Sequence, residues 1–169
     1  MKPNLYFCIF AVCLGLGLGQ PAIAQGTAVT SKLVAQRVEM GEGKAVVKPA
    51  GEGKPGEIIE YSGTYRNGGT VAVDKLLATI PVPVGTSFIA GSSNPAPAQA
   101  STDGTRFAPM PLIRTVRQSD GSERKEPVPL SDYRAVRWEV GTLSPDSMAV
   151  VSLRVRIDAP LTAATAAKP

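Results

Sequence analysis

An alternation of apolar and polar residues near the C-terminus constrains the fold of this chain more than any other feature. Val136, Trp138 and Val140 fall on one face of an extended chain, and residues 151–157 repeat the same pattern with Val, Leu, Val and Ile. A period of two residues is typical of half-buried β-strands. The intervening residues 141–147 include Gly, Pro and Asp, which end strands and form turns. The sequence therefore predicts two amphipathic strands joined by a short loop.

The same alternation, interrupted by Gly and Pro, predicts further strands along the chain. The expected strands are 33–40, 44–48, 57–67, 70–80, 85–90 and 105–107, followed by a polar hairpin made of 112–118 and 122–126. The dipeptide Asn67-Gly68 is a strong hairpin signal, so strands 57–67 and 70–80 are expected to pair. Pro81 is expected to stop the second of them, because proline cannot donate to a strand ladder.

No segment longer than a turn shows the period of a helix. Short strands separated by turn residues instead predict an all-β fold, an immunoglobulin-like antiparallel β-sandwich of about seven to nine strands. Residues 91–104, rich in Ser, Asn, Pro and Ala, are predicted to form a long surface loop. The sandwich is expected over residues 31–158, with a flexible lead-in at 25–30 and a disordered tail at 159–169.

Residues 1–24 have the pattern of a secretory signal peptide. Lys2 precedes an uncharged apolar run from Leu5 to Leu18, and Ala22-Ile23-Ala24 supplies the small residues of a cleavage site before Gln25. The alternative is a short membrane anchor, but the run is short for a hydrocarbon core of about 30 Å. The sequence therefore predicts export to the periplasm or the cell surface, with no transmembrane span in the mature chain.

The side chains that are absent limit the chemistry of the mature chain. Both cysteines, Cys8 and Cys13, lie in the predicted signal peptide, and the sequence contains no histidine. Histidine catalysis, histidine metal ligation and a Ser-His-Asp triad are thereby excluded. The net charge of +4 is spread through the chain, which favours solubility over a nucleic-acid partner.

The acidic residues are scattered among turns and on polar strand faces. Asp103-Gly104 and Asp120-Gly121 could suggest calcium loops, but calcium requires several oxygen ligands and each loop offers one carboxylate. Turn formation accounts for both pairs. The sequence therefore predicts no catalytic residue, no metal site and no cofactor.

A group of basic residues around the predicted hairpin is the only candidate interaction surface. It consists of Arg114, Arg117, Arg124, Lys125 and, as an exposed aromatic side chain at a strand start, Tyr133. The functional interpretation is a patch for an anionic polymer such as a surface polysaccharide. The alternative is a solvated edge hairpin whose charges prevent aggregation between strands. Trp138, between two valines on the apolar face, is predicted to lie in the core.

The order of several short motifs resembles a known family. The motifs are Lys54-Pro55-Gly56, residues 65–69 (Tyr-Arg-Asn-Gly-Gly), 80–86 (Ile-Pro-Val-Pro-Val-Gly-Thr), 101–104 (Ser-Thr-Asp-Gly) and 136–145, ahead of a closing valine-rich strand. Over residues 31–158 the chain resembles the bacterial conserved repeat domain catalogued as domain of unknown function eleven. The resemblance implies an immunoglobulin-like fold in an exported or cell-surface protein, and it implies no particular activity. The chain departs from the family in having a single copy and in having Asp146 where a glycine is usual.

These observations favour an exported, non-catalytic structural or interaction module of the bacterial cell envelope. The alternative is a protein that binds an envelope glycan or another anionic polymer through the loops of residues 91–132. In both cases the expected partner is an envelope protein or polysaccharide. The sequence specifies neither the identity of that partner nor the oligomeric state.

Overall fold

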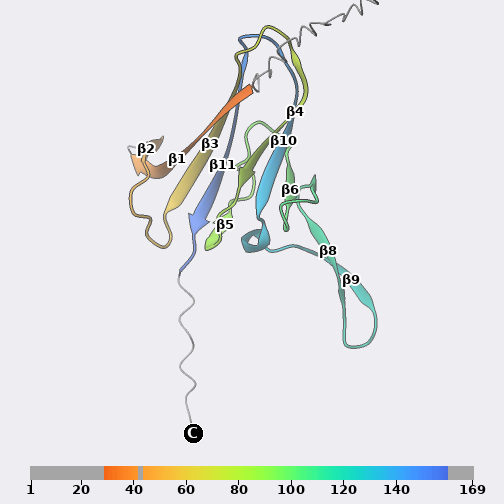
Figure 1. The fold of residues 1–169 in the computed structure, drawn as a ribbon. Helices are drawn as coiled ribbons and strands as arrows, with labels where there is room; N and C mark the ends of the chain where they lie inside the picture. Colours follow the sequence, from red (N-terminus) through yellow and green to blue (C-terminus); the bar gives the residue numbers. More distant parts are fainter. Residues whose placement is uncertain (1–28, 42–43, 160–169) are drawn as a thin grey trace, which may run out of the picture.

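The chain folds into two antiparallel β-sheets that pack face to face, with a separate hairpin at one end (Figure 1). The computed structural model describes residues 29–41 and 44–159. The predicted signal peptide 1–24, residues 25–28 of the predicted lead-in and residues 160–169 of the predicted tail lie outside the described residues. The only helical element among the described residues is a 3₁₀ turn, η1 (Leu130–Asp132). The prediction of an all-β sandwich is confirmed.

Both sheets are built from strands that are distant in the sequence. The five-stranded sheet has the order β2 (Lys44–Pro49), β1 (Val29–Gly41), β3 (Ile58–Asn67), β11 (Met148–Ile157) and β5 (Thr86–Phe88). The four-stranded sheet has the order β4 (Val73–Pro81), β10 (Ala135–Leu143), β6 (Gln99–Ser101) and β7 (Ala108–Pro109). The hairpin consists of β8 (Ile113–Arg117) and β9 (Glu123–Pro127). All these strand pairs are antiparallel.

The alternating face of the two C-terminal strands forms the core between the sheets. Val136 and Trp138 of β10 are buried, as are Val151, Leu153 and Val155 of β11. The two strands do not pair with each other, because β10 belongs to the four-stranded sheet and β11 to the five-stranded sheet. Their apolar faces therefore meet across the sandwich. Because each strand buries one face in this way, both show a strong alternation of apolar and polar residues.

The predicted hairpin at Asn67-Gly68 is wrong. Strand β3 pairs with β1 and β11, while β4 lies in the other sheet. The Asn67 side chain is buried, and its amide donates to the carbonyls of Val71 and Leu143 at 2.9 Å each. Its Oδ1 accepts the N–H of Gly69 at 3.0 Å. The Asn67 side chain therefore stabilises the connection between the two sheets. In the sequence, an asparagine in this role cannot be distinguished from the asparagine of a two-residue hairpin turn.

Strand β4 continues through Pro81 instead of ending before it. It is an edge strand of the four-stranded sheet, so a residue without an N–H can occupy its open side. That side is partly closed by Tyr65 of β3, whose hydroxyl accepts the Thr79 N–H at 3.0 Å and donates to the Thr79 carbonyl at 3.1 Å. The tyrosine therefore occupies backbone groups to which another strand would otherwise bind.

The predicted surface loop of residues 91–104 is also wrong for much of its length. Asn94 exchanges two backbone hydrogen bonds with Ser152 of β11, at 2.8 and 2.7 Å. Pro95 accepts the indole N–H of Trp138 at 2.7 Å, and Ala100 in β6 is fully buried. The segment runs from one sheet to the other and covers the flank between them. Its small residues carry no apolar period, and for that reason its burial is not visible in the sequence.

Two boundaries differ from the sequence prediction by a few residues. Val29 and Thr30, assigned to the flexible lead-in, already pair with β3 opposite Asn67 and Arg66. The brief strand expected at 105–107 is instead β7, which pairs with β6. The pair formed by β1 and β2 is a hairpin, consistent with the break expected near Gly41. None of these differences changes which faces are buried.

We expect Trp138→Ala to lower the free energy of unfolding by about 3–5 kcal/mol, because it deletes a buried large aromatic side chain and a hydrogen bond. The matched control is Leu77→Ala in β4, an apolar residue of the same sheet that is 48% exposed. This change should cost less than about 1 kcal/mol. Denaturant midpoints measure both, and equal midpoints would contradict the assignment of the core.

Candidate functional site

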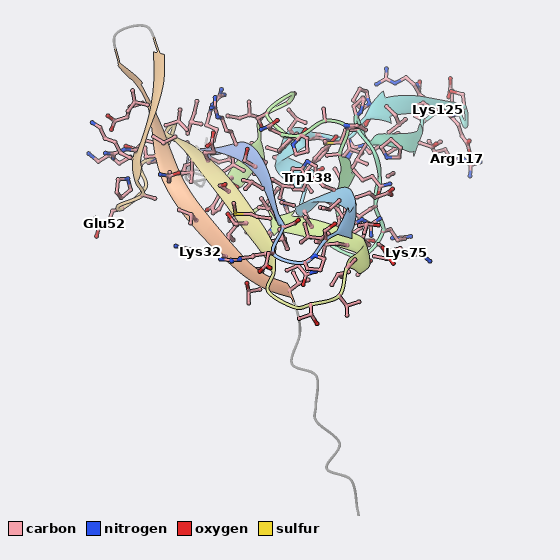
Figure 2. The ribbon with its side chains drawn as sticks, turned by 90° about the horizontal axis from the view of Figure 1, so that it is seen from above. Lys32, Glu52, Lys75, Arg117, Lys125 and Trp138 are labelled. Carbon is pink, nitrogen blue, oxygen red and sulfur yellow. The ribbon has the colours of Figure 1, made fainter. Side chains whose placement is uncertain are left out.

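The β8–β9 hairpin projects from one end of the sandwich (Figure 1). Its strands pair as predicted around Asp120-Gly121, with Thr115 opposite Lys125 and Arg117 opposite Glu123. Figure 2 shows Arg117 and Lys125 at the far end of the molecule, well away from the core residue Trp138. We call the β8–β9 hairpin the arm; it carries basic residues and projects from the sandwich.

The structure divides the predicted basic cluster into paired and unpaired charges. Glu126 accepts hydrogen bonds from Arg114, with a shortest N–O distance of 2.7 Å, and from Arg124 at 3.2 Å. These two arginines lower the pKa of the Glu126 carboxyl, and Arg114 has the larger effect. Arg117 and Lys125 make no ion pair with any described residue. The free positive charge of the arm is therefore at Arg117 and Lys125.

Tyr133 does not form the exposed aromatic contact that its place at a strand start predicted. The side chain is fully buried and stacks on Phe88, with ring centroids 5.6 Å apart. Its hydroxyl accepts the backbone N–H of Leu112 at 2.9 Å, at the base of β8. Met110 and Leu130 pack against the same buried cluster as Tyr133, so the position that alternation assigns to solvent is buried there. Tyr133 therefore holds the arm on the sandwich.

An apolar groove that sequence reasoning missed lies at the same end of the sandwich. It has a volume of about 450 Å³ and carries no charged side chain. A second hollow of about 340 Å³ continues it around β5. Phe88, Ala90 and Leu130 line both, while Arg156 lines only the second. The residues that line the larger hollow come from three separate segments, 88–98, 110–111 and 130–133. No local sequence pattern connects these segments.

The outer face of β10 is more covered than its polar alternation suggests. Arg137 lies on the face of β10 opposite Trp138, and its guanidinium lies 4.0 Å from the centre of the Phe107 ring. It also donates to the side-chain oxygen of Gln99 at 2.7 Å. A cation above an aromatic face is favourable, so Arg137 contributes to the packing of the segment before β7.

The Asp103 loop is organised by its own backbone. The Oδ1 of Asp103 accepts the N–H groups of Thr105 and Arg106, each at 2.8 Å. Its Oδ2 accepts the Arg106 guanidinium, also at 2.8 Å. These bonds stabilise the charged carboxylate and hold its pKa far below the ordinary value. Among the described residues, no group of three or more His, Cys, Asp or Glu side chains is placed to hold a metal ion.

Comparisons of the chain with protein-family models, curated proteins and solved structures find no match. Within residues 29–41 and 44–159, no helix has the length and apolar character needed to span a membrane.

We expect Tyr133→Phe to lower the free energy of unfolding by about 1–3 kcal/mol, because the buried Leu112 N–H loses its acceptor. Tyr61→Phe is the matched control, since no hydrogen bond involves the Tyr61 hydroxyl among the described residues. Its cost should lie within about 0.5 kcal/mol of zero. Hydrogen exchange at the Leu112 amide should accelerate in Tyr133→Phe alone, and unchanged exchange would contradict the role given to the hydroxyl.

The Asp103 carboxyl should remain ionised in acid that protonates ordinary aspartates. Its pKa in the folded state lies below the ordinary value of 3.8, so its loop bonds add stability above that pH. This contribution is lost as pH falls from about 3.8 toward the lower folded pKa. Carboxyl NMR should show no Asp103 midpoint between about pH 3 and 5 in the folded protein, and a midpoint there after unfolding in urea. A folded midpoint near 4 would contradict the loop geometry.

Proposed function

We propose that this protein is an exported, non-catalytic interaction module of the bacterial cell envelope. The observation that carries the proposal is the combination of the β8–β9 arm with an apolar groove at the same end of the sandwich. Recognition commonly uses loops and extensions that a rigid scaffold positions. The arm supplies reach and charge, and the groove supplies apolar surface that a partner can cover.

The export part of the proposal rests on sequence. Residues 1–24 have the charged start, apolar run and small-residue site of a signal peptide. The resemblance to the conserved repeat domain supports an envelope location, since that family occurs in exported and cell-surface proteins. The predicted mature chain contains neither histidine nor cysteine, which removes two versatile catalytic side chains and favours binding over catalysis.

The second proposed function is recognition of an envelope glycan or other anionic polymer. The two unpaired cations of the arm, Arg117 and Lys125, favour it. Against it, Asp120 and Glu123 lie beside them in the same hairpin. A protein partner accounts for the apolar groove as well as for the charges, and it is the preferred proposal for that reason.

The proposal is tested with a charge-reversed arm, Arg117→Glu with Lys125→Glu, and isolated envelopes of the source bacterium. Binding of the purified protein to these envelopes should weaken by about tenfold, because charges at the rim of an interface direct association. The control, Lys32→Glu with Arg66→Glu, makes the same charge change on strands β1 and β3, and Lys32 lies away from the arm in Figure 2. It should bind as the native protein does.

Treatment of the envelopes separates the two proposed functions. Protease digestion should abolish binding if the partner is a protein, and binding that survives protease but not polysaccharide hydrolases supports the glycan alternative. Equal binding by the arm variant and its control would overturn the arm as the contact surface.

A further inference from the structure

Strand β1 has an open backbone edge along its first half (Figure 1). Residues 29–35 pair with β3 on one side, whereas β2 joins the other side only from Gln36 onward, opposite Pro49. Residues 30–34 are all exposed. Within the part of the chain that the structure describes, no other segment makes a backbone hydrogen bond to the open side of residues 29–35. Another strand can therefore reach this edge.

The ladder of β3 determines which backbone groups of β1 point to the open side. The Asn67 N–H donates to the Ser147 carbonyl at 3.0 Å, so Asn67 and every second residue before it in β3 point their backbone groups toward β11. The residues between them point toward β1, where they lie opposite its even-numbered residues. The N–H and C=O groups of Ser31, Leu33 and Ala35 therefore point to the open side.

Elsewhere, the edge strands of the two packed sheets have features that hinder strand addition. Pro81 in β4, Pro109 in β7 and Pro49 in β2 each leave an edge strand without one of its N–H groups. Edge strand β5 lies against η1. Residues 29–35 of β1 contain no proline and carry a single charge, on Lys32. An edge of this kind is a template for pairing with another chain.

Leu33 lies on the core face of the sheet and is nevertheless 51% exposed. It is opposite Gly63 of β3, which is in turn opposite the buried Val151 of β11. Side chains directly opposite one another on neighbouring strands share a face. Strand β1 therefore extends beyond the cover of the four-stranded sheet. A strand added at this edge would cover apolar surface as well as backbone groups.

The predicted mature chain has little sequence ahead of β1 with which to cover the edge itself. Cleavage before Gln25 leaves only residues 25–28 in front of Val29. The tightest hairpin loop takes about two residues, so too few would remain for a second strand. This step rests on the export part of the proposed function.

We propose that this edge pairs with the same edge of a second copy of the chain, so that two five-stranded sheets join in a two-fold symmetric dimer. An antiparallel edge is complementary to itself, because each outward residue offers one N–H and one C=O to the residue opposite. A two-fold dimer uses the same surface on both copies. The single charge of the edge gives it little with which to select a foreign sequence, whereas a second copy always brings the matching edge.

Two constraints limit the register of the pair. An axis between the two copies of Leu33 brings Thr30 opposite Gln36 of the second copy, a position that Pro49 of that copy already occupies. An axis at Lys32 places two ammonium groups directly opposite each other, which is unfavourable. Both registers are therefore excluded.

An axis between the two copies of Ser31 satisfies both constraints. It places Lys32 opposite Thr30 of the second copy, and Leu33 opposite Val29 on the core face. An axis at Thr30 would leave Leu33 opposite none of the described residues. The structure therefore favours the Ser31 axis.

The dimer leaves the arm of each copy accessible. Figure 2 shows Lys32 well away from Arg117 and Lys125. One dimer thus carries two arms, and attachment at two sites of an envelope raises avidity without any new contact.

Single cysteines test the register, because the predicted mature chain contains none. In Ser31→Cys the two cysteines are directly opposite, with Cα atoms about 5.5 Å apart, which a disulfide can span. Mild oxidation of the purified exported chain should link it into dimers. Leu33→Cys, off the axis, should link no faster than Met148→Cys, a collision control at an exposed residue of β11.

Sedimentation tests the pairing without a crosslink. The native chain should form a dimer whose fraction rises with concentration. Leu33→Lys should raise the dissociation constant at least about tenfold, because it adds a charge beside Lys32 on both copies. The matched control is Val150→Lys on β11, since Val150 is also 51% exposed in the same sheet, and it should dimerise as the native chain does.

Hydrogen exchange tests which backbone groups are used. The amides of Ser31 and Leu33, which point to the open side, should exchange slowly in the dimer and rapidly on dilution. The Lys32 amide, which points to β3, should be protected in both states. Slow exchange of Ser31 and Leu33 in a monomer would show that another part of the chain, such as residues 160–169, covers the edge, and it would overturn the inference.

The inference also falls if the native chain stays monomeric up to about 1 mM. Equal dimerisation of Leu33→Lys and Val150→Lys, or equal linking of Ser31→Cys and Met148→Cys, would overturn it as well. The proposed function is tested separately, because the arm variant Arg117→Glu with Lys125→Glu should still dimerise. Envelope binding that depends on the arm in a monomeric chain would leave the proposed function standing while this inference falls.

Discussion

The burial of Trp138 between the two sheets is the interaction on which the rest of the structure depends. The indole lies in the middle of the apolar cluster, and its N–H must find an acceptor because an unpaired donor in the core is costly. The carbonyl of Pro95 provides that acceptor, and it does so from the segment that bridges the flank between the sheets. Packing and hydrogen bonding at one side chain therefore hold together the core and the segment that closes it.

A single side chain likewise links the core to the end of the molecule that carries the arm and the groove. Tyr133 stacks on Phe88 inside the sandwich, and its hydroxyl fixes Leu112 where the arm begins. Phe88 in turn lines the groove. The proposed contact surface is thus an extension of the core, which gives it a defined geometry. A rigid surface costs less conformational entropy on binding than a flexible loop does.

The sequence correctly predicted burial where it follows the two-residue period of a strand. It failed where burial or pairing depends on contacts with residues distant in the sequence. Residues 136–140 and 151–157 alternate because one face meets the core, and the structure confirms that face. Asn67-Gly68 was wrongly predicted to form a hairpin, since the asparagine side chain bonds to Leu143, far away in the sequence. Tyr133 was wrongly predicted to be exposed, because it belongs to a buried cluster that also contains Leu112 and against which Met110 and Leu130 pack.

The sequence by itself determined the all-β class, the inward face of the C-terminal strands and the presence of the polar hairpin, because each depends on residues a few positions apart. Only the tertiary structure decided how the strands divide between sheets and which of the hairpin's charges are paired. It also brought Phe88, Leu130 and Arg156 to one groove. Those outcomes depend on contacts between distant segments, and such contacts leave no period or motif in a single sequence.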